Sequence, residues 1–182
     1  MKKAALHNLG CKVNAYETEA MQEILEKHGY EIVPFGEKAD VYLINTCSVT
    51  NIADRKSRQM LHRARKMNPD AVVIAAGCYV QAAGRELLQD SSVDILIGNN
   101  EKANLPEILK AWEEEHDASH IHDLTREHTY EELSLSHTAE HTRAYMKIQD
   151  GCNQFCTYCI IPKLRGNYRS FPMEKLVKEA EE

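Results

Sequence analysis

The sequence predicts an α/β fold in which an open parallel sheet is flanked by helices. Three short apolar runs, over residues 4–9, 41–46 and 71–77, each lead into a cysteine, and a stretch with helical spacing of apolar residues follows each one. Nearly continuous apolar runs of this length are typical of parallel strands that are covered on both faces. The alternation of strands and helices therefore predicts a parallel sheet with right-handed crossovers.

The first expected elements are a strand over residues 4–9 and a helix over residues 16–28. Apolar residues recur in this helix at helical spacing, and Gly29 is a natural stop after its last turn. A short strand is expected next, over residues 30–33. The apolar run over 41–46 then forms a strand that ends directly at Cys47.

The next helix is expected over residues 52–67, with Ile52, Met60, Ala64 and Met67 on its apolar side and Asn68-Pro69 ending it. The strand over 71–77 follows, and then a shorter helix over 81–89 and a strand over 94–97. A last helix over 102–115 turns Leu105, Ile108, Leu109 and Trp112 inward. Together these elements define an N-terminal domain over residues 1–115.

Cys11, Cys47 and Cys78 follow the three apolar runs. Because loops after parallel strands lie on the carboxyl edge of a sheet, where open α/β folds place ligands, we expect the three thiols on one edge. Each could also be a small buried hydrophobic residue. Three cysteines at equivalent positions favour a cluster with three cysteine ligands over that alternative.

The other cysteines form a compact group, with Cys152, Cys156 and Cys159 within eight residues. A four-iron four-sulfur cluster normally takes four cysteine ligands, so three leave one iron open to a small molecule. The pair Cys156 and Cys159 alone would also suit half a zinc site or a redox dithiol. The additional cysteine counts against both of these alternatives.

Composition predicts a soluble, cytoplasmic protein that makes no contact with a membrane. The start of the chain is too short and too polar for a signal sequence, and no run has the apolar length of a membrane span. Without a secretory route, six cysteines argue against a disulfide framework and for metal binding or catalysis.

The net charge of −6 is distributed unevenly. Residues 116–142 form an acidic linker that holds six of the nine histidines, whose spacing matches no metal-ligand motif. The helix over 52–67 is basic, and Arg55, Arg58, His62 and Arg65 fall on one stripe of it. Such a stripe is either a solvated face or a phosphate-binding surface beside the cysteine edge. A second basic stretch, over residues 141–172, includes Arg165 and Arg169.

Four segments resemble the tRNA methylthiotransferases, a family of radical S-adenosylmethionine enzymes with two clusters. Within that family they are most similar to the branch that acts on threonylcarbamoyladenosine. The segments are Leu9-Gly10-Cys11-Lys12-Val13-Asn14, Asn45-Thr46-Cys47-Ser48-Val49-Thr50, Ala76-Gly77-Cys78-Tyr79 and the run from Arg143 to Cys152.

The resemblance implies that Cys152, Cys156 and Cys159 hold a 4Fe-4S cluster that binds and reductively cleaves S-adenosylmethionine, with Tyr158 near the adenine. It implies that Cys11, Cys47 and Cys78 hold an auxiliary 4Fe-4S cluster that carries or supplies sulfur. No further catalytic residue is assigned. Asn14 and Asn45 are candidates for hydrogen-bond donors to that cluster, or are polar turn residues at strand ends.

The implied partners are tRNA, an electron donor and a sulfur source. The implied reaction is methylthiolation at C2 of N6-threonylcarbamoyladenosine at position 37, the adenosine 3′ of the anticodon. The residues expected to contact tRNA phosphates are Arg55, Arg58, Arg65, Arg165 and Arg169.

Residues 143–182 resemble only the first strand-helix unit of a radical S-adenosylmethionine barrel, with a strand expected over residues 145–149 and a helix over residues 173–182. We therefore expect the chain to be a fragment that does not turn over by itself. Noncatalytic alternatives are a tRNA- or partner-binding module, a zinc protein and an iron-sulfur sensor.

Overall fold

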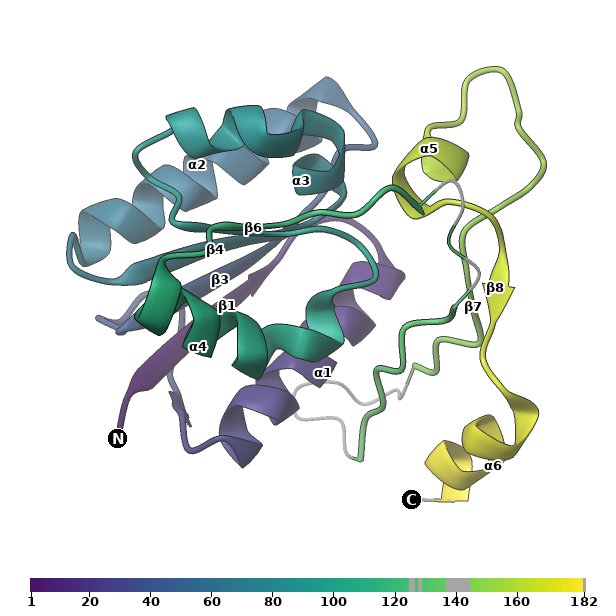
Figure 1. Ribbon diagram of the computed structural model, residues 1–182, viewed down its shortest axis with the longest axis horizontal. Coiled ribbons are helices and arrows are strands. Elements are labelled where there is room, and N and C mark those ends of the chain that lie inside the picture. The colour runs from purple at the N-terminus through teal and green to yellow at the C-terminus, as the bar shows by residue number, and fades with distance from the viewer. Residues whose placement is uncertain (125–126, 128, 137–144, 182) are drawn as a thin grey trace.

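A six-stranded sheet forms the centre of the computed structural model, which describes residues 1–124, 127, 129–136 and 145–181. All neighbouring strands are parallel, in the order β2-β1-β3-β4-β5-β6 (Figure 1). The strands are β1 (Lys3–Asn8), β2 (Glu31–Ile32), β3 (Val41–Thr46), β4 (Val72–Gly77), β5 (Ile95–Ile97) and β6 (Ser119–His120). The predicted parallel α/β fold is confirmed.

Helices cover both faces of this sheet. On one face lie α2 (Asn51–Met67), α3 (Cys78–Ala83) and the 3-10 turn η1 (Gly84–Gln89). On the other face lie α1 (Lys12–Lys27) and α4 (Leu105–Glu115), the latter preceded by the 3-10 turn η2 (Lys102–Asn104). Every residue of β3 is buried, as expected for a central strand between two helical layers.

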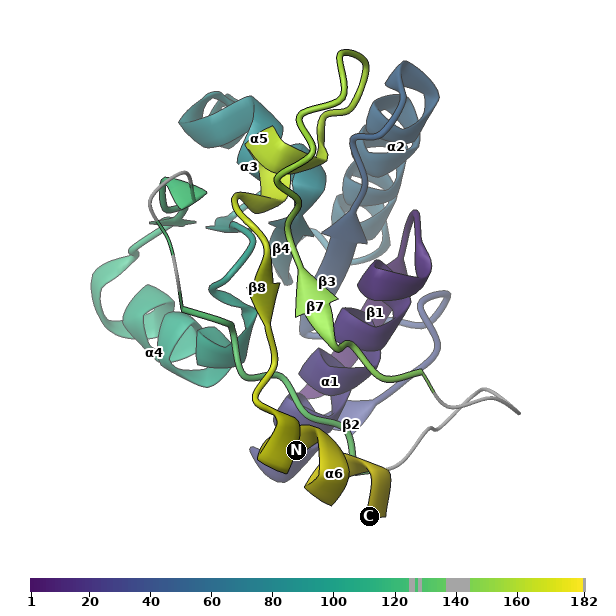
Figure 2. The ribbon, with the colours of Figure 1, turned by 90° about the vertical axis from the view of Figure 1, so that its right-hand side faces the viewer.

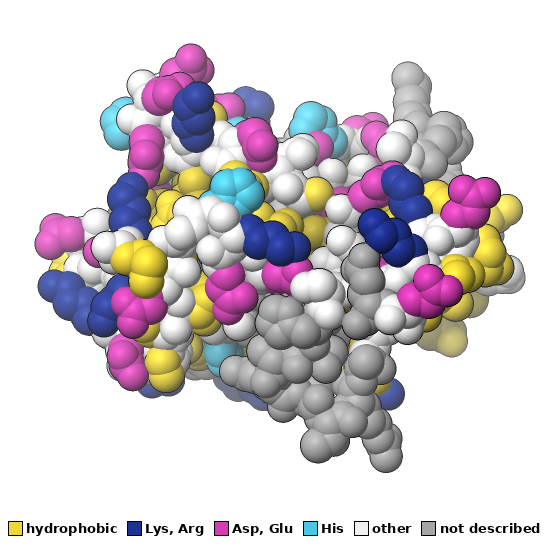
Figure 3. Space-filling view, turned by 90° about the horizontal axis from the view of Figure 1, so that it is seen from below, with side chains coloured by type: hydrophobic (Ala, Val, Ile, Leu, Met, Phe, Trp, Pro, Cys, Tyr) yellow, Lys and Arg dark blue, Asp and Glu magenta, His cyan; other side chains and the backbone are white. Residues whose placement is uncertain are grey.

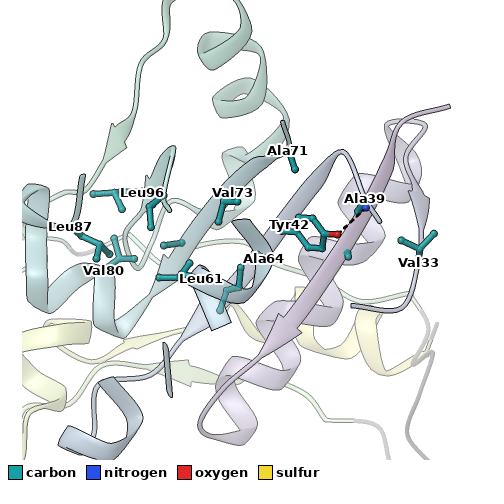
Figure 4. Close-up of a cluster of buried hydrophobic side chains, with 14 residues drawn as sticks. Val33, Ala39, Tyr42, Leu61, Ala64, Ala71, Val73, Val80, Leu87 and Leu96 are labelled. Carbon is teal, nitrogen blue, oxygen red and sulfur yellow. Dashed lines mark hydrogen bonds between the residues drawn. The ribbon is translucent and has the colours of Figure 1, made fainter. Parts of the chain in front are cut away.

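Two apolar cores result, one on each face of the sheet. In the first, Leu61 and Ala64 of α2 and Val80 of α3 pack on Tyr42, Val73 and their neighbours (Figure 4). The buried Tyr42 hydroxyl accepts a hydrogen bond from the Ala39 amide at 3.0 Å and donates one to the Glu37 carbonyl at 2.6 Å. The second core joins α1 and α4 to the opposite faces of β1, β3, β4 and β5.

Three helices differ from their predicted form. The helix predicted over 16–28 is α1, which begins at Lys12, directly after Cys11. The buried face of α2 consists of Ser57, Leu61 and Ala64, whereas Ile52, expected on the apolar side, is 59% exposed. Ile52 lies in the first turn of the helix, before the first buried position at Ser57. The helix expected over 81–89 is instead α3, which begins at Cys78 itself and is followed by η1.

The segment after α4 packs against the α/β core. Residues 119–120 add β6 to the sheet edge through hydrogen bonds from Leu96 and Gly98 to the carbonyls of residues 118 and 120. Leu133 and Leu135 pack on Tyr16 and Ala20 of α1. Within this predicted linker, residues 125–126, 128 and 137–142 lie outside the described residues, as do Arg143 and Ala144 of the fourth motif.

The C-terminal segment consists of an antiparallel pair and two helices, beside α1 and α3 (Figure 2). These elements are β7 (Gln149–Asp150), α5 (Ile161–Arg165), β8 (Arg169–Ser170) and α6 (Met173–Glu181). The strand expected over 145–149 is shorter than predicted. Among the described residues, β8 is the strand that pairs with it, and the pairing covers two residues of β7.

Candidate metal centre

The first three cysteines lie at one edge of the sheet, as the topology predicts. The strand ends are aligned, because Asn8 pairs with Asn45 and Thr46 pairs with Gly77. Cys11 is the exposed N-cap residue of α1, Cys47 follows β3 and is buried, and Cys78 is the buried first residue of α3. The carboxyl ends of three adjacent strands therefore each supply one thiol.

Gly10 and Cys47 are in close contact at this edge. A Cβ atom at Gly10 would lie 2.7 Å from Cys47 Cβ and 2.8 Å from its Sγ, and the φ angle of Gly10 is +104°. Burial raises the pKa of the Cys47 thiol, and the neighbouring sulfurs of Cys78 and Cys11 raise it further. The loop after β1 thus approaches Cys47 so closely that only a glycine fits at position 10.

Asn14 and Asn45 serve the scaffold rather than donating to a sulfur. Asn14 Oδ1 accepts a hydrogen bond from Arg165 at 2.9 Å and faces the Cys11 thiol at 3.8 Å. Because a guanidinium only donates, the oxygen of this amide must be the atom on that side. Asn45 Nδ2 donates to the Asn14 carbonyl and to Thr18 Oγ1. The predicted donor role of both asparagines is therefore wrong for this structure.

The sulfur of Cys78 has a different neighbour, Asn99, to which the sequence analysis assigns no role. Asn99 Nδ2 lies 3.6 Å from Cys78 Sγ, and the side chain is buried. Asn99 stands just after β5, the next strand of the sheet beyond β4. Its place at the carboxyl edge, equivalent to the places of the cysteines, is the signal that could have identified it.

The second cysteine group lies on the loop between β7 and α5. Cys156 is exposed and Cys152 and Cys159 are partly exposed, with the Cys159 amide donating to the Cys156 carbonyl at 2.9 Å. Gly151 starts the loop with a φ of +75°, and a Cβ there would collide with the Asn167 carbonyl oxygen. Tyr158, the residue predicted near adenine, is 92% exposed.

Both groups fit an iron-sulfur cluster by the chemistry of their donors, since each offers three free thiols. In the part of the chain that the structure describes, three His, Cys, Asp or Glu side chains are not gathered tightly enough to hold a metal ion. The fit therefore rests on donor type, on the common sheet edge and on the close approach of Gly10 to Cys47.

A buried charge network joins the two regions that carry the cysteines. Glu17 of α1 accepts from Lys102 at 2.7 Å, from Lys147 at 2.8 Å and from Arg165 at 2.9 Å. Asp150, two residues before Cys152, accepts from Arg165 at 3.0 Å and pairs with Lys147 at 2.7 Å. All five of these side chains are buried.

The network determines which of its groups are charged. Burial alone opposes ionisation of Glu17, but Arg165, Lys102 and Lys147 hold its pKa well below the usual value. Burial likewise opposes ionisation of Asp150, and Arg165 and Lys147 lower its pKa. Both carboxylates are therefore ionised at neutral pH.

Three of the five arginines predicted to contact tRNA have other roles. Arg165 and Arg169 are each 4% exposed. Arg165 belongs to the charge network, and Arg169 donates to the Arg165 carbonyl at 3.0 Å. Arg65 is partly buried, where it pairs with Asp94 and donates to two carbonyls. Because these guanidinium groups are turned into the protein, we correct their assignment to phosphate binding.

Arg55 and Arg58 remain exposed on α2, and Arg58 donates to the Tyr79 hydroxyl at 3.0 Å. They lie on the face of the sheet opposite α1 and α4. On the face seen from below, cations and acids are interspersed (Figure 3).

Membrane spanning can be judged from the helices. In the described ranges, each helix is too short or too polar to cross a membrane.

The fold and site together define an α/β protein with cysteines at the carboxyl edge of a parallel sheet and a second cysteine group on an adjoining segment. The chain belongs to the family described as "Uncharacterized protein family UPF0004", whose model matches residues 3–98.

Two curated relatives carry more specific names. The "Threonylcarbamoyladenosine tRNA methylthiotransferase MtaB" of Bacillus subtilis (strain 168) is 43% identical, over 100% of this chain and 41% of that protein. The protein of the same name from Aquifex aeolicus (strain VF5) is 39% identical, over 97% of this chain and 43% of that protein. These matches confirm the predicted resemblance. The chain spans about two fifths of the length of these relatives.

A solved structure has a similar fold. It is that of the "radical S-adenosylmethionine methyltransferase, TsrM, from Kitasatospora setae" with tryptophan and a S-adenosylmethionine analogue bound. The superposition has a TM-score of 0.63 and 14% sequence identity, and it covers 100% of this chain and 45% of that chain. At this identity the likeness concerns the fold alone.

Proposed function

We propose that this chain holds the two iron-sulfur sites of a radical S-adenosylmethionine methylthiotransferase that acts on tRNA. The observation that carries the proposal is the placement of Cys11, Cys47 and Cys78 at the ends of three adjacent parallel strands. The 43% identity to a threonylcarbamoyladenosine tRNA methylthiotransferase supports threonylcarbamoyladenosine as the modified nucleoside. Such an enzyme would act in the cytoplasm, where tRNA is its partner.

In this proposal each cysteine group holds one 4Fe-4S cluster, and the second leaves an iron open for S-adenosylmethionine. When bound, the clusters supply the electron for cleavage of S-adenosylmethionine and a site for sulfur. The chain's own residues hold the ligands in place. Gly10 permits close packing against Cys47, and the Glu17 network fixes the base of the second cysteine loop at Asp150. Tyr158, exposed on that loop, is the proposed contact of the adenine.

The proposed reaction replaces the hydrogen at C2 of the adenosine at position 37 with a methylthio group. The C2–H bond breaks and the hydrogen atom leaves in 5′-deoxyadenosine. A C–S bond to a methylthiolate then forms at C2, and the one electron released would be taken up by the sulfur-bearing cluster held by Cys11, Cys47 and Cys78. An electron donor drives cleavage of one S-adenosylmethionine, a second one provides the methyl group, and a sulfur source provides the sulfur.

Arg55 and Arg58 are the proposed contacts of the tRNA backbone, because they are exposed on the helix that begins beside Cys47. The logarithm of the tRNA association constant falls linearly with the logarithm of the salt concentration, and each phosphate contact that is lost should make this slope less steep by about 0.7 to 0.9. Arg55→Ala should therefore weaken tRNA binding and flatten its salt dependence. Lys110→Ala, on the opposite helical layer, is the matched control.

Iron and acid-labile sulfide per chain, measured after anaerobic reconstitution, test the metal sites directly. We expect about eight irons in the unsubstituted chain and about four in a variant with Cys11→Ala, Cys47→Ala and Cys78→Ala. About four irons in both would mean that the first group holds no cluster. Zinc in place of iron would favour the zinc-protein alternative.

The tRNA substrate is tested in cells. Deleting the gene that encodes this chain should remove the methylthio form of threonylcarbamoyladenosine from hydrolysed tRNA, as measured by mass spectrometry. Restoring the gene with Cys156→Ala should leave the modification absent. An unchanged nucleoside profile, with clusters present, would instead favour an iron-sulfur sensor.

A further inference from the structure

Asn99 occupies the fourth position in the row of strand ends that carries the cysteines. The loops after β1, β3 and β4 contribute Cys11, Cys47 and Cys78, and the next strand, β5, is followed by Gly98 and then Asn99. The Asn99 side chain is completely buried. A buried amide at this position needs partners for both its nitrogen and its oxygen.

The orientation of the Asn99 amide is determined by Lys102. The Lys102 ammonium lies 2.8 Å from Asn99 Oδ1, and an ammonium has no lone pair with which to accept. The oxygen must therefore face Lys102, which leaves Nδ2 on the opposite side. Lys102 is itself fully buried and is held by Glu17 at 2.7 Å.

Nδ2 then has two acceptors within reach. It donates to the Leu164 carbonyl at 2.8 Å, and it lies 3.6 Å from Cys78 Sγ. An amide nitrogen carries two hydrogens, so it can serve both acceptors at once. The main chain is fixed as well, because the backbone N–H of Asn99 donates a hydrogen bond to Gln81 Oε1 at 3.0 Å. Gln81 lies one turn after Cys78 on α3.

We propose that Asn99 is a positioning residue that donates an N–H hydrogen bond to the Cys78 sulfur of the first iron-sulfur site and raises its reduction potential. This inference rests on the proposed function, because it requires a cluster at Cys78. A ligand sulfur carries more negative charge when its cluster is reduced, so a fixed donor stabilises the reduced state. The shared contact with Leu164 ties this donor to the C-terminal segment that carries the second cysteine group.

The test is an EPR-monitored potentiometric titration of the reconstituted chain in which Cys152, Cys156 and Cys159 are replaced by Ala, so that one cluster remains. Asn99→Ala should lower the potential. We expect about a tenfold fall in the ratio of reduced to oxidised cluster at the midpoint of the parent, which is about 59 mV for a one-electron couple. Asn104→Ala is the control, because Asn104 is exposed, and its side chain donates to Glu101 Oε2 at 3.0 Å rather than capping the backbone of α4.

The sign of the shift separates a hydrogen bond from a loss of packing. If Asn99→Ala only opened the site to water, solvation of the more negative reduced state would raise the potential. An unchanged or raised potential, or an equal shift in Asn104→Ala, would overturn the inference and leave the proposed function standing. Failure of the parent chain to assemble a cluster would instead contradict the proposed function at this site.

Lys102→Met provides a second route if Asn99→Ala does not assemble the cluster. It keeps the Asn99 amide but removes the cation that fixes its orientation and, with it, one buried positive charge, and both changes should lower the potential. A potential equal to that of the parent would overturn the inference.

Discussion

The charge network centred on Glu17 makes a quantitative prediction about stability. Glu17→Gln keeps the shape of the side chain but removes its charge, which three buried cations share. Lys147 and Arg165 would still face Asp150, at 2.7 Å and 3.0 Å. Lys102 would keep the neutral oxygen of Asn99 as its hydrogen-bond acceptor. The substitution thus takes away the carboxylate that pairs directly with a fully buried ammonium.

Removing one partner of a buried ion pair typically costs about 3 to 5 kcal/mol. For a chain of this size, each kcal/mol lowers Tm by about 2 to 4 °C, so Glu17→Gln should lower Tm by roughly 6 to 20 °C. The free energy of unfolding would be measured by urea titration followed by circular dichroism. Glu26→Gln, an exposed site on the same helix, is the matched control and should change stability by less than about 0.5 kcal/mol.

The double variant of Glu17→Gln with Lys102→Met gives a second check on the cause. Because it also removes the buried ammonium, it should be more stable than Glu17→Gln alone. A loss below about 1 kcal/mol in Glu17→Gln, or a double variant as unstable as the sum of its single changes, would refute this account of the network.

Three further predictions concern pH, the second cysteine loop and α2. Folding lowers the pKa of Glu17, so the ionised carboxylate stabilises the fold at any pH above its pKa in the unfolded chain, and this stabilisation is lost as pH falls through its pKa in the folded chain. The free energy of unfolding should therefore fall less steeply with decreasing pH in Glu17→Gln than in the unsubstituted chain. Gly151→Ala should destabilise the chain by about 1 to 3 kcal/mol more than Gly29→Ala, since both have positive φ but a Cβ at Gly29 meets no atom within 4 Å. Arg65→Ala should lower the free energy of unfolding by about 1.5 to 3 kcal/mol, whereas Arg55→Ala should leave it nearly unchanged.

Each of these predictions has a contrary result. An equal slope of unfolding free energy against pH in the two proteins would mean that the pKa of Glu17 is the same in the folded and unfolded chains. Equal losses in the two glycine variants, by urea titration, would mean that the contact with Asn167 carries no energy. Equal stability of the two arginine variants would mean that the contacts of Arg65 contribute nothing.

The fold could be predicted because its signals are local. Each of β1, β3 and β4 is an apolar run, and each helix shows its own periodicity. The common edge for Cys11, Cys47 and Cys78 then follows from parallel topology without any knowledge of side-chain contacts. Ile52 shows the limit of this reasoning, because helical spacing does not reveal which turns of a helix are covered by the rest of the protein.

The cysteines and the alternation of strands and helices are thus properties that the sequence by itself determined. Only the tertiary structure decided the roles of Arg165 and Asn99. In the sequence, Arg165 belongs to a basic stretch, yet its partner Glu17 lies 148 residues away along the chain. Asn99 likewise contacts Cys78, which lies 21 residues before it. The physical reason is that a buried charge or amide is defined by the groups that surround it, and those groups come together only when distant segments pack.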